Sequence, residues 1–309
     1  TAAANVDGEG FACVDVICDG RHGLGLGTSD DDIKRFADKV LERGLSITTV
    51  VAPVWPGAGG GSAMGDNVAQ QKFLDAVRFA CHVGDIFKKK GARQWGNIRV
   101  DSAEFGIAEW RKDTAANTAR IVETFQLATQ LAMGSGERLA AEMEVCWAGM
   151  HSVPRMVEVL EKVGQPKGFG LMADLAHVYT AMLGYNAPED AMLPLDRDYT
   201  EPEFWAAYEK VAGQLRDWTI DFHVAQNDGT VHGAGDHDKT GKHCQADDPN
   251  GRLDIVKCAG YWLTDAGKRG IRHICWDGCM FPNAVLEKQQ TWNTVLKKML
   301  EVRDAHGWD

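Results

Sequence analysis

The sequence has no long apolar run, and its basic residues are outnumbered. No stretch reaches the roughly 20 apolar residues that a membrane-spanning helix needs, which argues against a membrane protein. Lys and Arg number 33 against 44 Asp and Glu, and the formal net charge is −11 at pH 7. Nucleic acids and anionic membrane surfaces bind clustered positive charge. The composition therefore disfavours both as partners.

The eight cysteines lack the spacing of a zinc or redox motif. None forms a Cys-x-x-Cys pair, and the closest two are Cys275 and Cys279. Most lie in apolar stretches, which is typical of buried, reduced thiols. We therefore expect a reducing compartment and a cytoplasmic protein.

Short apolar segments alternate with amphipathic segments along the chain. Predicted strands are 11–18, 46–53, 96–101, 138–145, 169–175, 218–225 and 271–277. Predicted helices are 29–43, 68–90, 113–133, 152–163, 203–216, 253–269 and 284–305. Strands that alternate with helices pair in parallel through crossover connections. The sequence predicts a single α/β domain over residues 1–309, a (β/α)8 TIM barrel whose first strand–helix unit is missing before residue 11. An open seven-stranded sheet is the alternative.

Two segments interrupt this alternation. Residues 55–65 are rich in glycine, but the run lacks the lysine of a phosphate-binding loop, so we expect a flexible lid. Residues 226–252 form a long polar loop, and long loops in compact domains are usually functional or disordered. A second metal site, a lid over the substrate and a solvated loop remain open for this segment.

Acidic and histidine side chains end the last four predicted strands. Glu142, Asp174, His223 and Asp277 occupy these ends. In a barrel of this kind the carboxyl ends of the strands carry the active site. One such residue alone is usually an exposed or salt-bridged side chain, but four together call for a cation. Three carboxylates and an imidazole suit one divalent metal ion, Mn²⁺, Mg²⁺, Co²⁺ or Zn²⁺.

These motifs resemble the xylose isomerase-like TIM-barrel superfamily of sugar isomerases and epimerases, which includes ketose 3-epimerases and inosose dehydratase-like proteins. The stretches that carry the resemblance are 139–142, 172–177, 223–228 and 270–277. They occur in the same order and spacing over residues 11–300. The resemblance implies the barrel fold and a metal that holds adjacent oxygens of a sugar.

The resemblance also implies roles for single residues. Glu142 becomes the first metal ligand and an acid/base candidate, Asp174 the second ligand and His223 the third. His177 contacts substrate hydroxyls. Asp277 stands where the family usually has glutamate, so it can ligate the metal, but its reach toward a substrate carbon is in doubt.

Glu144 is a rival for the role of Glu142. Both side chains lie on the same face of a strand, because side chains alternate with a period of two. We favour Glu142 as the ligand and assign Glu144 to proton transfer or substrate binding, or to a supporting role outside the ligand set. Neighbouring carboxylates should raise the pKa of Glu144, which suits a general acid or base. A hydride-shift aldose isomerase is disfavoured, because relatives of that type have lysine at this position.

Several aromatic and histidine side chains are candidates for contact with a sugar. Aromatic faces often line sugar pockets, although core packing explains them equally well. The candidates besides His177 are His22, Trp55, Trp147, His232 and His237.

The leading functional interpretation is a metal-dependent sugar isomerase or epimerase. Glu142, Glu144 or Asp277 would remove a proton next to a carbonyl, and the metal would stabilise the enediolate. The alternative is a lyase or dehydratase that eliminates a group β to a carbonyl of a keto-sugar, cyclitol or oxidised glycoside. A sugar-binding module without metal is a third hypothesis. The expected partner is a small sugar or keto-sugar, and a homo-oligomer is compatible with the sequence.

Overall fold

A computed structural model describes the chain except for residues 1, 103–105, 196–197, 233–239, 279–280 and 308–309. Within the described residues, one parallel sheet has the order β1-β2-β3-β4-β5-β6-β9. Its strands are β1 (Cys13–Ile17), β2 (Ser46–Val51), β3 (Ile98–Val100), β4 (Leu139–Glu142), β5 (Phe169–Asp174), β6 (Thr219–Val224) and β9 (Cys275–Trp276). β9 also lies against β1, so the sheet curls into a nearly closed ring.

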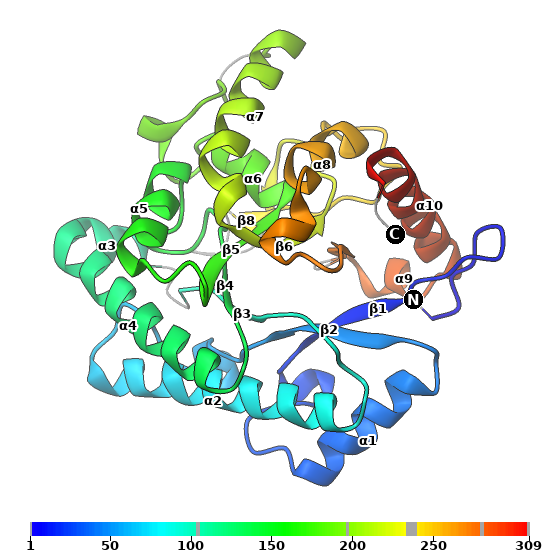
Figure 1. Cartoon of the computed structure of the whole chain (residues 1–309). Coiled ribbons are helices and arrows are strands. Elements are labelled where there is room, and N and C mark those ends of the chain that lie inside the picture. The colour runs from blue at the N-terminus through cyan, green and yellow to red at the C-terminus, as the bar shows by residue number, and fades with distance from the viewer. Residues whose placement is uncertain (1, 103–105, 196–197, 233–239, 279–280, 308–309) are drawn as a thin grey trace.

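Helices cover the outside of this ring (Figure 1). They are α1 (Asp30–Leu41), α2 (Asn67–Lys89), α3 (Ile107–Lys112), α4 (Thr114–Gly134), α5 (Val153–Val163), α6 (Leu175–Met182), α7 (Glu201–Leu215), α8 (Ile255–Leu263), α9 (Asn283–Leu286) and α10 (Gln289–His306). Single 3-10 turns are η1 (Gly20–His22), η2 (Pro56–Ala58), η3 (Pro188–Asp190), η4 (Arg216–Trp218) and η6 (Ala266–Arg269). The strands and helices confirm the predicted barrel architecture. No helix in the described part of the chain is long and apolar enough to cross a membrane.

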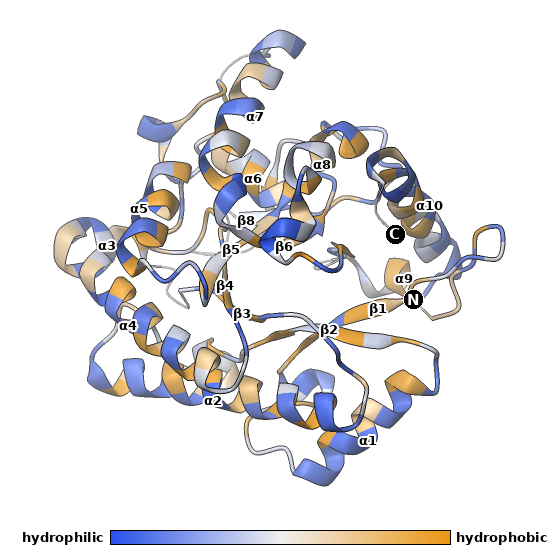
Figure 2. Ribbon diagram, in the orientation of Figure 1, coloured by the Kyte–Doolittle hydropathy of each residue, from blue (hydrophilic) through white to orange (hydrophobic). Residues whose placement is uncertain are grey.

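Local sequence signals set the helix boundaries. Ser29 accepts a hydrogen bond from the backbone N–H of Asp32 and begins α1. Thr200 and Glu203 form a reciprocal capping box at the start of α7. Gly164 ends α5 in the left-handed conformation, with φ of 63°. Apolar side chains of the helices face the ring, while their outer faces are polar (Figure 2). The main hydrophobic core therefore lies between the strands and the helices.

The second half of the glycine-rich run after β2 is packed, unlike the flexible lid that we expected over the whole run. Residues 60–64 are all buried. A Cβ atom at Gly61 would lie 1.9 Å from the carbonyl oxygen of Ala69 in α2, and one at Gly60 would lie 2.3 Å from Val54. The glycines allow the chain to pass close to α2, rather than giving the loop freedom to move.

The long loop after β6 contains a short antiparallel hairpin that the sequence does not predict. β7 (Val231–His232) pairs with β8 (Thr240–Gly241). Cys244 donates a backbone hydrogen bond of 2.8 Å to Gln226, and the Asn227 side chain donates to the carbonyl oxygens of Thr230 and Lys242. These contacts fasten the described part of the loop to the end of β6. It is therefore an ordered element and not a freely solvated one.

Candidate metal centre

The four side chains that end the last strands meet at one point. Glu142 ends β4, Asp174 ends β5, His223 lies near the end of β6 and Asp277 follows β9. Asp174 and His223 are register partners on neighbouring strands. One ligand atom from each of the four residues lies within 4.8 Å of those from the others. We call these four residues the mouth cluster, and they are the residues that the sequence singled out.

Asp174 has two roles at the junction of β5 and α6. Its Oδ1 accepts hydrogen bonds from the backbone N–H groups of Ala176 at 2.8 Å and His177 at 3.1 Å, which begins α6. Its Oδ2 is buried and accepts no hydrogen bond from the described residues. A buried carboxylate oxygen without a donor is costly, and a bound cation would relieve that cost.

His223 lies between two carboxylates. Its Nε2 is 2.9 Å from Oδ2 of Asp15 on β1, and its Nδ1 is 3.6 Å from Oδ2 of Asp277. Burial alone would lower the pKa of His223, but the neighbouring carboxylates of Asp15 and Asp277 outweigh burial and raise it to about 10. Burial likewise opposes ionisation of Asp15, yet His223 and His273 together hold its pKa well below the usual range. Asp15 was not among the predicted site residues, although a lone acid in the apolar strand CVDVI is a visible signal.

Glu142 and Glu144 share two neighbours, the guanidinium of Arg99 and the imidazole of His177. Arg99 on β3 pairs with Glu142, and its Nη2 lies 3.4 Å from Oε1 of Glu144. His177 Nε2 lies 3.7 Å from Oε1 of each glutamate. Glu142 is fully buried, and its Oε1 has no hydrogen-bond donor among the described residues.

The expected rise in the pKa of Glu144 was wrong. Burial does act to raise it, but His177, Arg99 and a hydrogen bond from Thr240 outweigh burial and lower the pKa to about 2. The expectation counted only neighbouring carboxylates, whereas the fold places a guanidinium and an imidazole beside Glu144. Trp147, predicted as a substrate contact, is buried and also lowers the pKa of Glu144 through a hydrogen bond.

The β7–β8 hairpin and the residues after it complete the mouth. Thr240 donates a hydrogen bond to Oε2 of Glu144. Gly241 lies so close to α6 that a Cβ atom would be 2.8 Å from Nδ1 of His177. His243 Nε2 lies 3.3 Å from Asp174 and 3.7 Å from Asp277. No local pattern in the sequence distinguished His243 from the other polar residues of its loop.

The electrostatics of His243 resemble those of His223. Burial alone would lower its pKa, but Asp277 and Asp174 raise it to about 9. Two buried imidazoles with raised pKa values indicate that the surrounding carboxylates require positive charge. A divalent cation would supply that charge.

The donor set fits a divalent metal ion. The mouth cluster offers carboxylate oxygens and one imidazole nitrogen, and atoms of Glu142, Asp174 and His223 lack hydrogen-bond partners among the described residues. Oxygen-rich sets with one imidazole suit Mg²⁺, Mn²⁺, Co²⁺ or Zn²⁺. Three overlapping groups could also hold an ion: Asp15, His223 and Cys275; Asp174, His177 and His243; Glu142, Glu144 and His177.

The remaining predicted substrate contacts are placed differently. His22 is exposed in η1, after β1, and half-buried Trp55 precedes η2 and packs against the core. His237 lies outside the described residues, and only the backbone of His232, in β7, is described. A substrate role for these four residues stays a prediction.

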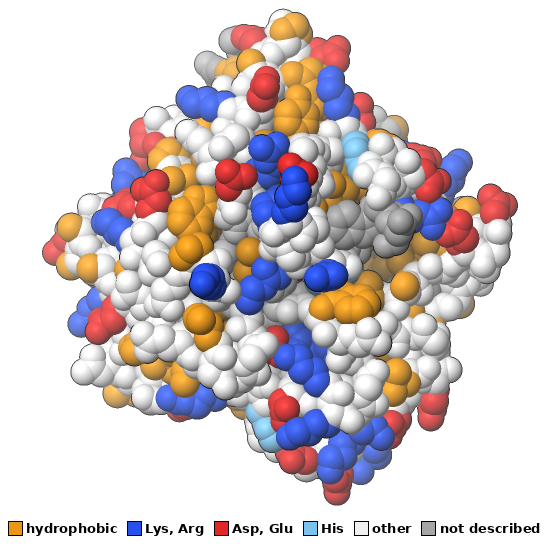
Figure 3. Space-filling model, in the orientation of Figure 1, with side chains coloured by type: hydrophobic (Ala, Val, Ile, Leu, Met, Phe, Trp, Pro, Cys, Tyr) orange, Lys and Arg blue, Asp and Glu red, His pale blue; other side chains and the backbone are white. Residues whose placement is uncertain are grey.

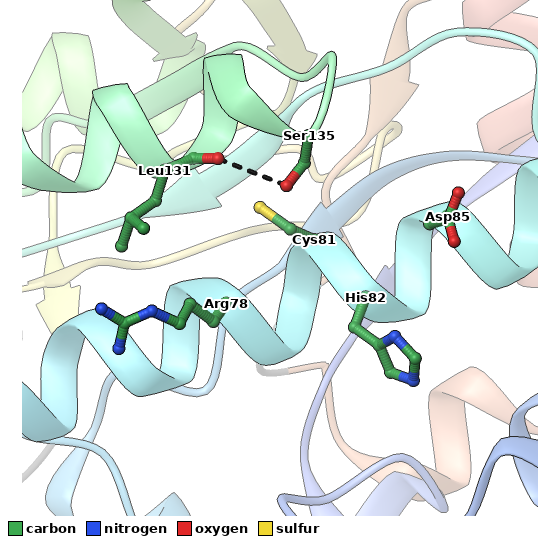
Figure 4. A pocket seen from close by; sticks show the side chains of 6 residues that line it. All are labelled: Arg78, Cys81, His82, Asp85, Leu131 and Ser135. Carbon is green, nitrogen blue, oxygen red and sulfur yellow. Dashed lines mark hydrogen bonds between the residues drawn. The ribbon is translucent and has the colours of Figure 1, made fainter.

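A separate hollow opens on the outer surface between α2 and α4 (Figure 4). It measures about 340 Å³ and shares no lining residue with the mouth cluster. Its walls are Arg78, Cys81, His82, Asp85, Leu131 and Ser135.

Figure 3 shows Lys and Arg side chains near the centre of the face in view, so the acidic residues do not dominate every part of that face. Neither feature has the convergent, unpartnered ligand atoms of the mouth.

Comparison with known proteins identifies the fold. No family model and no curated protein sequence matches the chain. Among solved structures, a D-tagatose 3-epimerase-like protein superimposes with a TM-score of 0.65 at 13% identity, covering 98% of this chain and 96% of the other. An L-ribulose 3-epimerase gives 0.57 at 14% identity, with coverage of 96% and 86%. A xylose isomerase-like TIM-barrel protein from Mycobacterium smegmatis, solved with magnesium, gives 0.59 at 13% identity, with coverage of 96% and 85%. The chain therefore has the TIM-barrel fold of these structures.

Proposed function

We propose that the protein is a metal-dependent sugar isomerase or epimerase. The mouth cluster carries the proposal, because its buried ligand atoms converge at the end of the barrel where enzymes of this fold class place their chemistry. The structural similarity to D-tagatose 3-epimerase-like and L-ribulose 3-epimerase structures supports a ketose or keto-sugar as the substrate. Magnesium in a similar structure supports a divalent metal as the cofactor.

In this proposal some residues would hold the metal, and others would transfer protons or bind substrate. Glu142, Asp174, His223 and Asp277 would hold the metal, which supplies a Lewis acid for adjacent substrate oxygens and for the charge of an enediolate. Glu144 is ionised at neutral pH and would accept a proton from a carbon next to the carbonyl. His177 lies between the two glutamates and can donate a hydrogen bond to a substrate hydroxyl.

A lyase or dehydratase is the second candidate. Elimination β to a carbonyl requires one base and an acid for the leaving group. His243 supports this alternative, because an imidazole with a pKa of about 9 is protonated at neutral pH and lies beside Asp174 and Asp277. Because elimination needs only one base, it does not depend on a symmetrical pair of glutamates, and the shorter Asp277 is compatible with it.

Deuterium exchange separates these candidates. The metal-loaded protein is incubated in D2O with free ketoses and, separately, with 3-keto-glycosides, and NMR follows the recovered sugars. We expect deuterium at the carbon next to the carbonyl with no group lost. Release of water or an aglycone would replace isomerisation with elimination. A wild-type protein that contains no stoichiometric metal and exchanges no proton would instead support a sugar-binding module.

A further inference from the structure

Asp15 and His223 form a buried contact across the ring. They lie on β1 and β6, 208 residues apart in sequence, and the distance from Nε2 to Oδ2 is 2.9 Å. The side chains of Asp15 and His223 are only 12% and 7% exposed. Water therefore competes little for this hydrogen bond, and the two strands fix its geometry.

The other oxygen of Asp15 is anchored to β2. Its Oδ1 accepts a hydrogen bond of 2.8 Å from the backbone N–H of Thr49, and the Thr48 hydroxyl donates to the same atom. This leaves Oδ2 directed at the imidazole of His223. Asp15 is thus held rigidly by the neighbouring strand, which is what a carboxylate needs in order to orient a second side chain.

The contact assigns different roles to the two ring nitrogens of His223. An ionised carboxylate can only accept, so Nε2 carries the hydrogen that is donated to Asp15. A histidine that binds a metal must be neutral, so Nδ1 would release its proton when the ion binds, while Nε2 keeps its hydrogen. Nδ1 lies 3.6 Å from Asp277, is buried and has no hydrogen-bond partner among the described residues. The nitrogen that faces the mouth cluster is therefore the one available as a metal ligand.

We propose that Asp15 is a positioning residue that fixes the ring orientation and tautomer of His223, so that Nδ1 binds the metal. This inference rests on the proposed metal-dependent function. Metal-ligating histidines commonly donate their second ring N–H to a carboxylate, and loss of that carboxylate weakens metal binding. The arrangement also makes His223 a stronger donor than an isolated imidazole.

One competing arrangement uses the same residues. Asp15, His223 and Cys275 could themselves hold an ion, with Nε2 as the donor. A sulfur ligand is soft and disfavoured by Mg²⁺ and Mn²⁺, and an ion bound there would replace the 2.9 Å hydrogen bond between Nε2 of His223 and Asp15. The mouth cluster, in contrast, offers three carboxylates.

The test measures metal affinity without any sugar. Mn²⁺ and Co²⁺ are titrated in competition with a chromophoric chelator into the wild type, Asp15→Asn, Asp15→Ala and the control Asp221→Asn. Asp221 is also buried on β6 but contacts Thr49 and His273 instead of His223. We expect Asp15→Asn to weaken binding by about 10- to 100-fold. Asp15→Ala should weaken it further, because the asparagine oxygen can still accept from Nε2, and the control should bind as the wild type does.

A measurement on the wild type tests the assignment even if a variant fails to fold. In the Zn²⁺-loaded protein labelled with ¹⁵N-histidine, NMR should find Nε2 of His223 protonated and Nδ1 bound to metal. The reverse pattern, or a thiolate-to-cobalt absorption band that Cys275→Ser removes, would overturn the proposal in favour of the competing site. Equal affinity of Asp15→Asn and the wild type would also overturn it. A wild type that binds no divalent ion would refute the proposed function itself.

Discussion

Two buried charged clusters lie at opposite ends of the strands, and they differ in how well their atoms are paired. At the amino ends, Arg93 donates to the carbonyl oxygens of Thr48 at 2.6 Å and Asn97 at 3.2 Å and binds both carboxylate oxygens of Glu137. Lys88 lies 2.6 Å from the same carboxylate. We call Lys88, Arg93 and Glu137 the base cluster.

The mouth cluster consists of three carboxylates and an imidazole, and several of their atoms are left unpaired. Asp174 Oδ2, Glu142 Oε1 and His223 Nδ1 have no hydrogen-bond partners among the described residues. A fully paired buried charge mainly stabilises or specifies the fold, whereas a cluster with unpartnered ligand atoms requires something from outside the chain. The pairing of individual atoms therefore distinguishes a structural cluster from a functional one better than residue type does.

The largest expected effect is at the mouth. His223→Ala should abolish metal binding and turnover together, because it removes the only imidazole of the mouth cluster. Metal analysis and the deuterium-exchange assay measure the two properties. His151→Ala is the control, since His151 is a buried histidine that packs on Trp110 and belongs to no group of described residues that could hold an ion. Turnover by His223→Ala with normal metal affinity would show that the ligand assignment is wrong.

Glu144→Gln should have a smaller effect, which separates metal binding from turnover. We expect metal affinity to be retained and kcat to fall by about 10²- to 10⁴-fold, the usual contribution of a general acid or base. Isothermal titration with metal and steady-state kinetics provide the two readouts. The opposite result, lost metal with Glu144→Gln and retained metal with Glu142→Gln, would exchange the roles of the two glutamates.

A substitution in the base cluster should lower the free energy of unfolding and leave metal affinity unchanged. Glu137→Ala leaves Arg93 buried with only part of its pairing, and breaking a buried ion pair costs about 3–5 kcal/mol of unfolding free energy. Denaturant unfolding of the metal-free protein measures this loss, with the exposed Glu161→Ala on α5 as the control. Metal affinity should stay at the wild-type value. A fall in metal affinity without loss of stability would contradict the division between the two clusters.

The barrel was predictable because each strand is a short apolar segment between clear helix signals. The strand ends, and with them Glu142, Asp174, His223 and Asp277, follow from that alternation alone. α6 was missed because its apolar sequence LAHVYTAM continues directly from the strand FGLMAD with no polar break. The β7–β8 hairpin was missed because its two-residue strands are too short to show a period.

The partners of the predicted residues could not be read from the sequence. Arg93 and Glu137 are 44 residues apart, and Asp15 and His223 are 208 apart. Only closure of the ring brings them together. The pKa of Glu144 was misjudged for the same reason, because Arg99 and His177 come from other parts of the chain. Sequence patterns thus located the candidate ligands, while tertiary contacts set their protonation and orientation.

The double use of Asp174 has an evolutionary consequence. One oxygen starts α6 and the other is an unpartnered candidate metal ligand, so under the proposed function selection for folding and selection for activity would both act on this side chain. A descendant that lost its catalytic role would still benefit from aspartate here, because the helix cap alone is worth about 0.5–2 kcal/mol. An aspartate at this position in a diverged homologue would therefore be weak support for retained activity. A histidine at the position of His223, which caps no helix, would be the more informative marker.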